Sequence, residues 1–286
     1  MDEELHESKD NKTIPMTSIT SGSGQEVLND LYYYTDQIVN ISFIGFPNEG
    51  DWVLVDAGLP KAAAEIRSVV VDRFGRDSTP SAVILTHGHF DHVGGLLELV
   101  EEWEVPVYAH ELELPYLTGE KSYPKPDSTV EGGFLAKISG MYPNEPINIG
   151  NAVQALPQDN SVPGLDDWKW IHTPGHSPGH VSFYRENDSL LLSGDAFITV
   201  RQDSFYNVLM QTVEVNGPPR YLTTDWQAAK ESVEKLEALQ PEIVVPGHGS
   251  VMKGEELKQG LTKLVQTFDQ SAIPDYGRFV DGDKKH

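Results

Sequence analysis

The chain has 286 residues and a formal net charge of −23, because 44 acidic side chains stand against 21 basic ones. Such a surface repels phosphate backbones and anionic membranes, so we expect no nucleic acid and no membrane as partners, but a small-molecule substrate. Cysteine is missing, which excludes disulfides and thiolate metal ligands. The length suffices for a sizeable core, and we expect a monomer or a homodimer.

Both ends of the chain are polar. Residues 1–24 show no periodicity and no basic region followed by an apolar run, which predicts a flexible tail in a cytoplasmic protein, with Met16 as an alternative start. The folded part is expected to be a single domain over 25–273, followed by a polar tail over 274–286.

The first half of this domain alternates strands and helices. Apolar side chains follow Pro60 at helical spacing, at Ile66, Val69, Val70 and Phe74. The expected elements are, in chain order, a hairpin of strands at 38–44 and 52–55, a helix from Pro60 to Gly75, a strand at 82–85, a helix at 96–103 and a strand at 105–109.

Residues 115–164 lose this regularity. Proline and glycine recur there, aromatic residues are scattered, and no repeat is visible. Because long irregular segments in compact domains usually have a function, we expect an inserted cap or lid.

The second half resumes the alternation. It predicts strands at 168–171, 181–184 and 190–192, an irregular stretch at 197–222, a helix opened by a capping box at 224–227, a strand at 243–245, and a helix marked by Leu257, Leu261, Leu264 and Phe268. Two successive β-then-α halves predict an α/β sandwich of two sheets with helices outside.

A cluster of histidines follows the apolar strand at 82–85. His87, His89, Asp91 and His92 form the pattern H-x-H-x-D-H on one short loop. Neutral imidazole and carboxylate are ordinary ligands of zinc. In addition, polar groups buried at this density each need a bonding partner, which a metal would supply. The pattern therefore predicts a metal site. Other such residues follow later apolar strands: His172, His176, His180, Asp195 and His248.

The chain resembles the metallo-β-lactamase superfamily over roughly residues 35–270. The resemblance rests on five motifs in the order typical of that family: Asp56 in Val55–Gly58, then His87/His89/Asp91/His92, His176, Asp195 and His248. The resemblance, on its glyoxalase-II/lactonase-like branch, implies a four-layer αβ/βα sandwich with two divalent metal ions. It assigns His87, His89 and His176 to the first metal, Asp91, His92 and His248 to the second, and Asp195 to a bridge.

Two zinc ions lower the pKa of a shared water, so a hydroxide bridging them is expected to attack a carbonyl. Asp91 is the candidate for carrying a proton to the leaving group. The same ligands also accept iron, manganese or cobalt.

Further residues receive supporting roles. Asp56, His172 and His180 are expected to support the ligands, whereas His110 is expected to be a supporting or surface residue. The candidates for a hydrophobic substrate pocket are Phe90, Tyr142, Phe205, Tyr206, Tyr221 and Trp226, although each of these aromatics is also compatible with an ordinary core position.

The fold alone does not choose a reaction. Asp195 favours hydrolysis of a lactone or ester such as an acylated homoserine lactone over β-lactam hydrolysis, because true β-lactamases lack this bridging aspartate. A glyoxalase-II-like thioesterase remains an alternative, as does a mononuclear-iron persulfide dioxygenase from another class. A degenerate binding module is disfavoured because every ligand position is kept.

The acidic composition generates a first prediction. Hydrated carboxylates suit a salty milieu, so we expect a moderately halophilic or salt-tolerant source, and a melting temperature that rises between low and molar salt as self-repulsion is screened. Calorimetry across this range tests the idea, and an unchanged melting temperature contradicts it.

Overall fold

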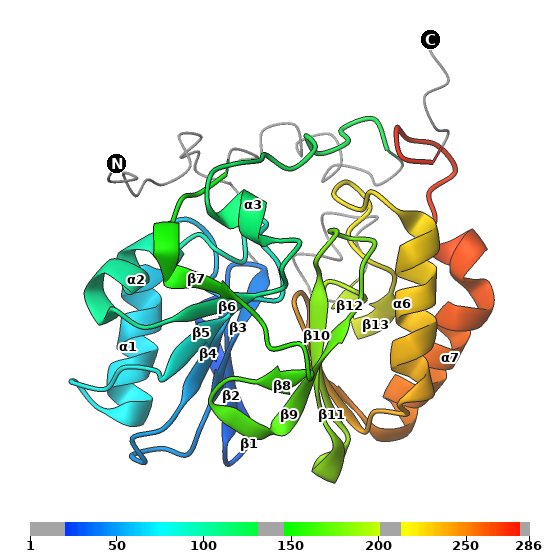
Figure 1. The fold of residues 1–286 in the computed structure, drawn as a ribbon. Coiled ribbons are helices and arrows are strands. Elements are labelled where there is room, and N and C mark those ends of the chain that lie inside the picture. Colours follow the sequence, from blue (N-terminus) through cyan, green and yellow to red (C-terminus); the bar gives the residue numbers. More distant parts are fainter. Residues whose placement is uncertain (1–20, 131–145, 201–212, 281–286) are drawn as a thin grey trace. The chain divides into compact units, whose positions relative to one another are not determined.

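The computed structural model describes residues 21–130, 146–200 and 213–280. It divides into two compact units (Figure 1). The first unit comprises Met1–Tyr123 and Pro143–Trp168, and the second comprises Pro124–Tyr142 and Lys169–His286. Residues 1–20 of the tail expected over 1–24, the middle of the expected cap and the last six residues lie outside the described residues.

The first sheet has the order β1-β2-β3-β4-β5-β6-β7. Its strands are β1 Ser23–Leu28, β2 Leu31–Asp36, β3 Val39–Ile44, β4 Val53–Val55, β5 Ala82–Ile84, β6 Val107–Ala109 and β7 Val153–Ala155. The strands from β1 to β4 pair antiparallel, and β3 and β4 form the expected hairpin, with Phe43 opposite Leu54. The pairs from β4 to β7 are parallel.

Two helices cover one face of this sheet, α1 Ala63–Phe74 and α2 Leu96–Trp103 (Figure 1). Their buried apolar residues belong to one core with side chains of β3 to β6. Trp52 stacks on Phe74 at 4.4 Å between ring centroids, which ties the helix to the start of β4. Both helices lie where the apolar spacing predicted them.

The interval 115–164 contains more regular structure than the sequence pattern indicates. Helix α3 Leu114–Leu117 and the 3-10 turn η1 Gly150–Ala152 border it or lie in it. Strand β7 pairs in parallel with β6, with Val107 opposite Val153. The pattern missed β7 because its three residues are half-exposed or exposed and show no apolar alternation.

The second sheet has the order β15-β14-β11-β10-β9-β8. Its strands are β8 Ser161–Val162, β9 Leu165–His172, β10 Val181–Arg185, β11 Leu190–Gly194, β14 Ile243–Pro246 and β15 Met252–Lys253, with the 3-10 turn η2 Glu186–Asp188 between β10 and β11. Strands β11 and β14 are parallel, with Leu191 opposite Val244. Two further strands, β12 Ile198–Val200 and β13 Val213–Asn216, pair with each other inside the stretch expected to be irregular.

The second unit has its own helical layer, α6 Trp226–Ala238 and α7 Gly254–Ser271 (Figure 1). Their apolar stripes share a core with residues of β11, β13 and β14. The N-cap of α6 is Asp225, whose carboxylate accepts the N–H of Ala228 at 2.9 Å, rather than Thr224 of the expected capping box. The helices α6 and α7 thus pack on strands of the second unit, as α1 and α2 do on strands of the first.

Both ends of the described chain are more ordered than the sequence indicates. Strand β1 begins at Ser23, before the expected start of the domain, and Gly22 donates to the carbonyl of Thr35 at 2.9 Å. Near the C-terminus, the N–H of Arg278 donates to Asp127 at 2.6 Å. No helix among the described residues is both long and apolar enough to cross a membrane.

Close backbone approach makes Gly94 a sharp test of this fold. A Cβ atom at Gly94 would lie 2.0 Å from the carbonyl carbon of Leu59, and the Gly94 N–H donates to Gly58 at 2.7 Å. Gly94→Ala should therefore lower the free energy of unfolding by about 1–3 kcal/mol or more in urea denaturation, because the backbones must separate. Gly50→Ala is the control, because a Cβ there meets nothing within 4 Å. Equal stability of both variants would contradict this account.

Candidate functional site

Each unit places its candidate residues after two neighbouring parallel strands. In the first unit Asp56 follows β4, and the loop from Thr86 to Gly94, called here the metal loop, follows β5. In the second unit Asp195 follows β11 and His248 follows β14, and the N–H of Gly247 bonds to the carbonyl of Gly194 at 2.9 Å. Because carboxyl ends of adjacent parallel strands share one edge, side chains distant in sequence meet there.

Asp56 fixes both ends of the metal loop. Its carboxylate is 3% exposed and accepts the N–H and the hydroxyl of Thr86, each at 2.8 Å, and the Nδ1 of His92 at 2.8 Å. The backbone of Asp56 is left-handed, with φ +63°, which a non-glycine residue adopts only where its surroundings hold it. These contacts match the supporting role expected for Asp56.

The same contacts determine the tautomers of two histidines. A carboxylate only accepts, so Nδ1 of His92 carries a proton. The Thr86 hydroxyl gives its single proton to Asp56, so it accepts from Nδ1 of His87 at 3.0 Å. In both neutral rings Nε2 therefore has the lone pair that a metal requires.

The candidate ligands of the first unit lie close together. Three pairs of residues have possible ligand atoms within 4.8 Å of each other: His87 with His89, His87 with His92, and Asp91 with His92. All four residues are buried. The metal loop therefore brings together the H-x-H-x-D-H residues as a cluster of metal-binding type.

In the second unit, a tight turn directs His176. Gly175 has φ +126°, and a Cβ atom there would lie 2.3 Å from the backbone nitrogen of Ala229. Its carbonyl accepts the N–H groups of Thr224 and Asp225, both at 3.1 Å. Glycine is thus required both by the backbone conformation and by the close approach of α6.

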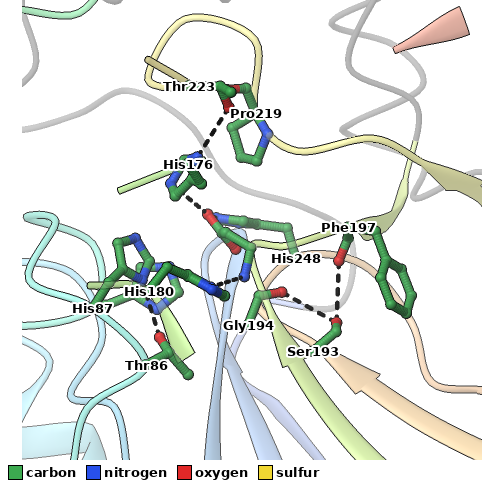
Figure 2. A network of polar contacts seen from close by, with 12 residues as sticks. Thr86, His87, His176, His180, Ser193, Gly194, Phe197, Pro219, Thr223 and His248 are labelled. Carbon is green, nitrogen blue, oxygen red and sulfur yellow. Dashed lines mark hydrogen bonds and ion pairs between the residues drawn. The ribbon is translucent and has the colours of Figure 1, made fainter. Parts of the chain in front are cut away.

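A hydroxyl also sets the tautomer of His176. Thr223 donates its proton to the carbonyl of Pro219 at 2.7 Å, so it accepts from Nδ1 of His176 at 3.2 Å (Figure 2). Nε2 of His176 therefore holds a lone pair in the neutral ring.

Asp195 joins two imidazoles of this unit. Its Oδ2 lies 3.3 Å from Nε2 of His176 and 3.3 Å from Nε2 of His248. A lone pair facing a carboxylate oxygen is unfavourable unless a second proton or a cation lies between them. Nitrogen and oxygen ligands of a tetrahedral zinc ion are separated by about 3.4 Å, so the arrangement fits a metal that Asp195 helps to hold.

His180 and His172 bind backbone groups instead. Nε2 of His180 accepts the N–H of Asp195 at 2.9 Å, and its Nδ1 donates to the carbonyl of Thr173 at 3.1 Å. Nε2 of His172 bonds to the carbonyl of Pro178 at 2.9 Å. His180 thus holds the backbone at Asp195, and both rings bond to the loop that carries His176. His110 is likewise bonded locally, to the N–H of Leu112.

The described pocket candidates have different surroundings. Phe90 is half-buried in the metal loop. Tyr221 is buried, and its carbonyl accepts the N–H of Asp127 at 2.8 Å. Trp226 packs in the apolar core of the second unit, the ordinary role that the pattern also allowed. The remaining candidates, Tyr142, Phe205 and Tyr206, lie outside the described residues.

Two residues next to the metal loop were missed by sequence reasoning. Glu113 and Tyr123 both contact the backbone N–H of Gly88. Burial, and then the charge of Glu113, raises the pKa of Tyr123 well above its usual value, so its phenol remains a donor. No local signal marks them, because Glu113 lies in an acidic stretch and Tyr123 is one of several scattered aromatics.

The chain is similar in sequence to known proteins. The chain is 47% identical over 254 residues to the probable metallo-hydrolase YflN of Bacillus subtilis, covering 88% of this chain and 96% of that protein. It is 32% identical over 215 residues to the probable metallo-hydrolase YybB of the same organism, covering 74% and 83%.

Solved structures share the fold. The di-iron-bound form of TTHA1623 is 27% identical with a TM-score of 0.51, covering 82% of this chain and 93% of that one. The metallo-beta-lactamase family protein TTHA1429 of Thermus thermophilus is 19% identical with a TM-score of 0.56, covering 85% and 81%. The expected α/β sandwich class is thereby confirmed. The model of the metallo-beta-lactamase superfamily matches residues 34–248, which include every candidate ligand, and the chain belongs to this superfamily.

Proposed function

We propose that the protein is a metal-dependent hydrolase of a lactone or other small carboxylic ester. The observation that carries the proposal is the contact of Asp195 Oδ2 with Nε2 of both His176 and His248, at 3.3 Å each. Three buried groups converge there, two imidazoles and a carboxylate, and these groups are ordinary ligands of a divalent cation. The printed names of YflN and YybB, both probable metallo-hydrolases, support the same class of reaction.

The proposed ligand sets follow the superfamily pattern. His87, His89 and His176 would hold one cation, Asp91, His92 and His248 would hold the other, and Asp195 would contribute to both. Zinc is the metal proposed, although imidazole and carboxylate ligands also accept iron, and TTHA1623 has been solved in a di-iron-bound form.

Bound divalent cations would lower the pKa of water toward neutrality and polarise a carbonyl. The residues of the chain prepare the site for this chemistry. Asp56 and Thr86 keep His87 and His92 in the tautomer that presents Nε2. Asp91 is the group proposed to carry a proton to the leaving alkoxide, because it is a buried carboxylate on the metal loop.

Charge supports a neutral substrate. With a net charge of −23, the protein repels anions, which slows the approach of phosphodiesters and of carboxylated β-lactams and thioesters. A lactone carries no charge and avoids this barrier. Asp195 supports the same choice, because the true β-lactamases that share the remaining pattern lack this bridging carboxylate.

The proposal predicts the outcome of a combined metal and substrate analysis. Full-length protein should bind two equivalents of divalent metal by elemental analysis, and should open lactones in a pH-stat assay that a chelator abolishes. A panel of lactones, thioesters, β-lactams and phosphodiesters provides the comparison. Cleavage of thioesters alone would replace the lactonase assignment by a thioesterase. One iron per chain, with oxygen uptake on a persulfide, would overturn the hydrolase assignment.

Asp195→Asn tests the role of the shared carboxylate. Loss of the negative charge should remove at least one equivalent of metal and lower kcat/KM by about 100-fold or more. The matched control is Asp188→Asn, which removes a carboxylate paired with Arg185 at 2.7 Å in the turn between β10 and β11. Unchanged metal content in Asp195→Asn would exclude Asp195 as a ligand.

A further inference from the structure

A buried carboxylate and a buried phenol enclose the backbone of the metal loop. The N–H of Gly88 is shared between Oε2 of Glu113, at 2.9 Å, and the phenolic oxygen of Tyr123, at 3.1 Å. The Tyr123 hydroxyl in turn donates to the same oxygen of Glu113. Glu113 is fully buried, immediately before α3. The three groups form a closed set of hydrogen bonds, called here the Gly88 clamp.

Packing reinforces the clamp. The ring of Tyr123 lies against the imidazole of His89, with 4.5 Å between centroids, and stacks on Tyr116 at 4.0 Å with an interplanar angle of 8°. A Cβ atom at position 88 would lie 2.7 Å from the Tyr123 oxygen and 3.2 Å from a methyl carbon of Leu117. A side chain at position 88 would therefore press against the hydroxyl of Tyr123, which glycine avoids.

The position of the clamp determines what it controls. Gly88 lies between His87 and His89, so fixing its peptide N–H fixes the directions in which both side chains leave the backbone. Asp56 holds the loop at Thr86 and at His92, and through Thr86 it also supports His87. The Gly88 clamp is an additional support that acts on the part of the loop carrying His87 and His89, so its loss should affect the first of the two proposed metals.

We propose that Glu113 and Tyr123 are positioning residues for His87 and His89 and thereby set the affinity of the first metal. This inference rests on the proposed function, since it presumes that His87 and His89 are ligands. Neither Glu113 nor Tyr123 is a ligand itself. Tyr123 lies in the expected cap at 115–164, so the clamp also ties this part of the cap to the metal loop.

The test measures stepwise metal affinity in full-length variants. Tyr123→Phe keeps the aromatic ring and removes the hydroxyl, and should weaken binding of the first of two zinc equivalents by about 10- to 100-fold in chelator competition, while the second is unchanged. The absorption bands of the cobalt-loaded protein should shift for the same equivalent. Glu113→Leu should have the larger effect. Glu113→Gln should retain most of the affinity, since an amide oxygen can accept from both Gly88 and Tyr123, as Oε2 of Glu113 does.

A control separates positioning from simple loss of stability. Thr35→Val removes a buried hydrogen bond of the same unit, from Thr35 to Asn40 at 2.9 Å between β2 and β3. It should lower the melting temperature of the metal-free protein without changing either zinc affinity. If Tyr123→Phe binds both equivalents as wild type does, or loses both equally, the positioning role is wrong. If wild-type protein binds no metal, the proposed function itself fails, which is a distinguishable result.

Discussion

The carboxylate of Asp56 is the constraint on which the rest of the first unit's site depends. It is buried at the end of β4 in a left-handed backbone conformation, and it receives hydrogen bonds from both Thr86 and His92. A buried charge is stable only when its hydrogen-bonding capacity is met, so the strand end and the loop must come together for either to be satisfied. The unusual backbone conformation of Asp56 is thus accompanied by hydrogen bonds that join the end of β4 to the loop.

In the second unit, neutral groups hold the candidate ligands in place. The hydroxyl of Thr223 orients His176, and the imidazole of His180 holds the backbone of Asp195. For His87, His92 and His176 the supporting partner engages Nδ1 of the ring, which leaves the lone pair of the neutral ring on Nε2. In both units, hydrogen bonds therefore orient the imidazoles and fix which nitrogen can bind a metal, whether the supporting group is charged or not.

The candidate metal ligands were easier to identify from the sequence than the residues that hold the metal loop in place. His87, His89, Asp91 and His92 are adjacent along the chain, and the helices α1 and α2 show strong apolar spacing, so local pattern sufficed. Strand β1 was missed because it is an exposed edge without alternation, and β7 because it is short and has no buried residue. Glu113 and Tyr123 were missed for a different reason. Their importance arises only from tertiary contact with Gly88, which no spacing along the chain encodes.

The buried carboxylates give a final argument about the metals. Asp56, Asp91, Glu113 and Asp195 are candidate ligands or contact the metal loop, and each is less than 5% exposed. Asp127 is as well buried but accepts hydrogen bonds from Thr129 and Arg278 instead. As ionised groups the first four carboxylates carry four negative charges, which two divalent cations would balance. In a protein that is already strongly acidic, the metal-free form must bear this charge in surroundings poor in water, at a cost that cations would remove. Metal binding and the stability of the fold should accordingly be coupled, because the cations favour the folded state that assembles their ligands.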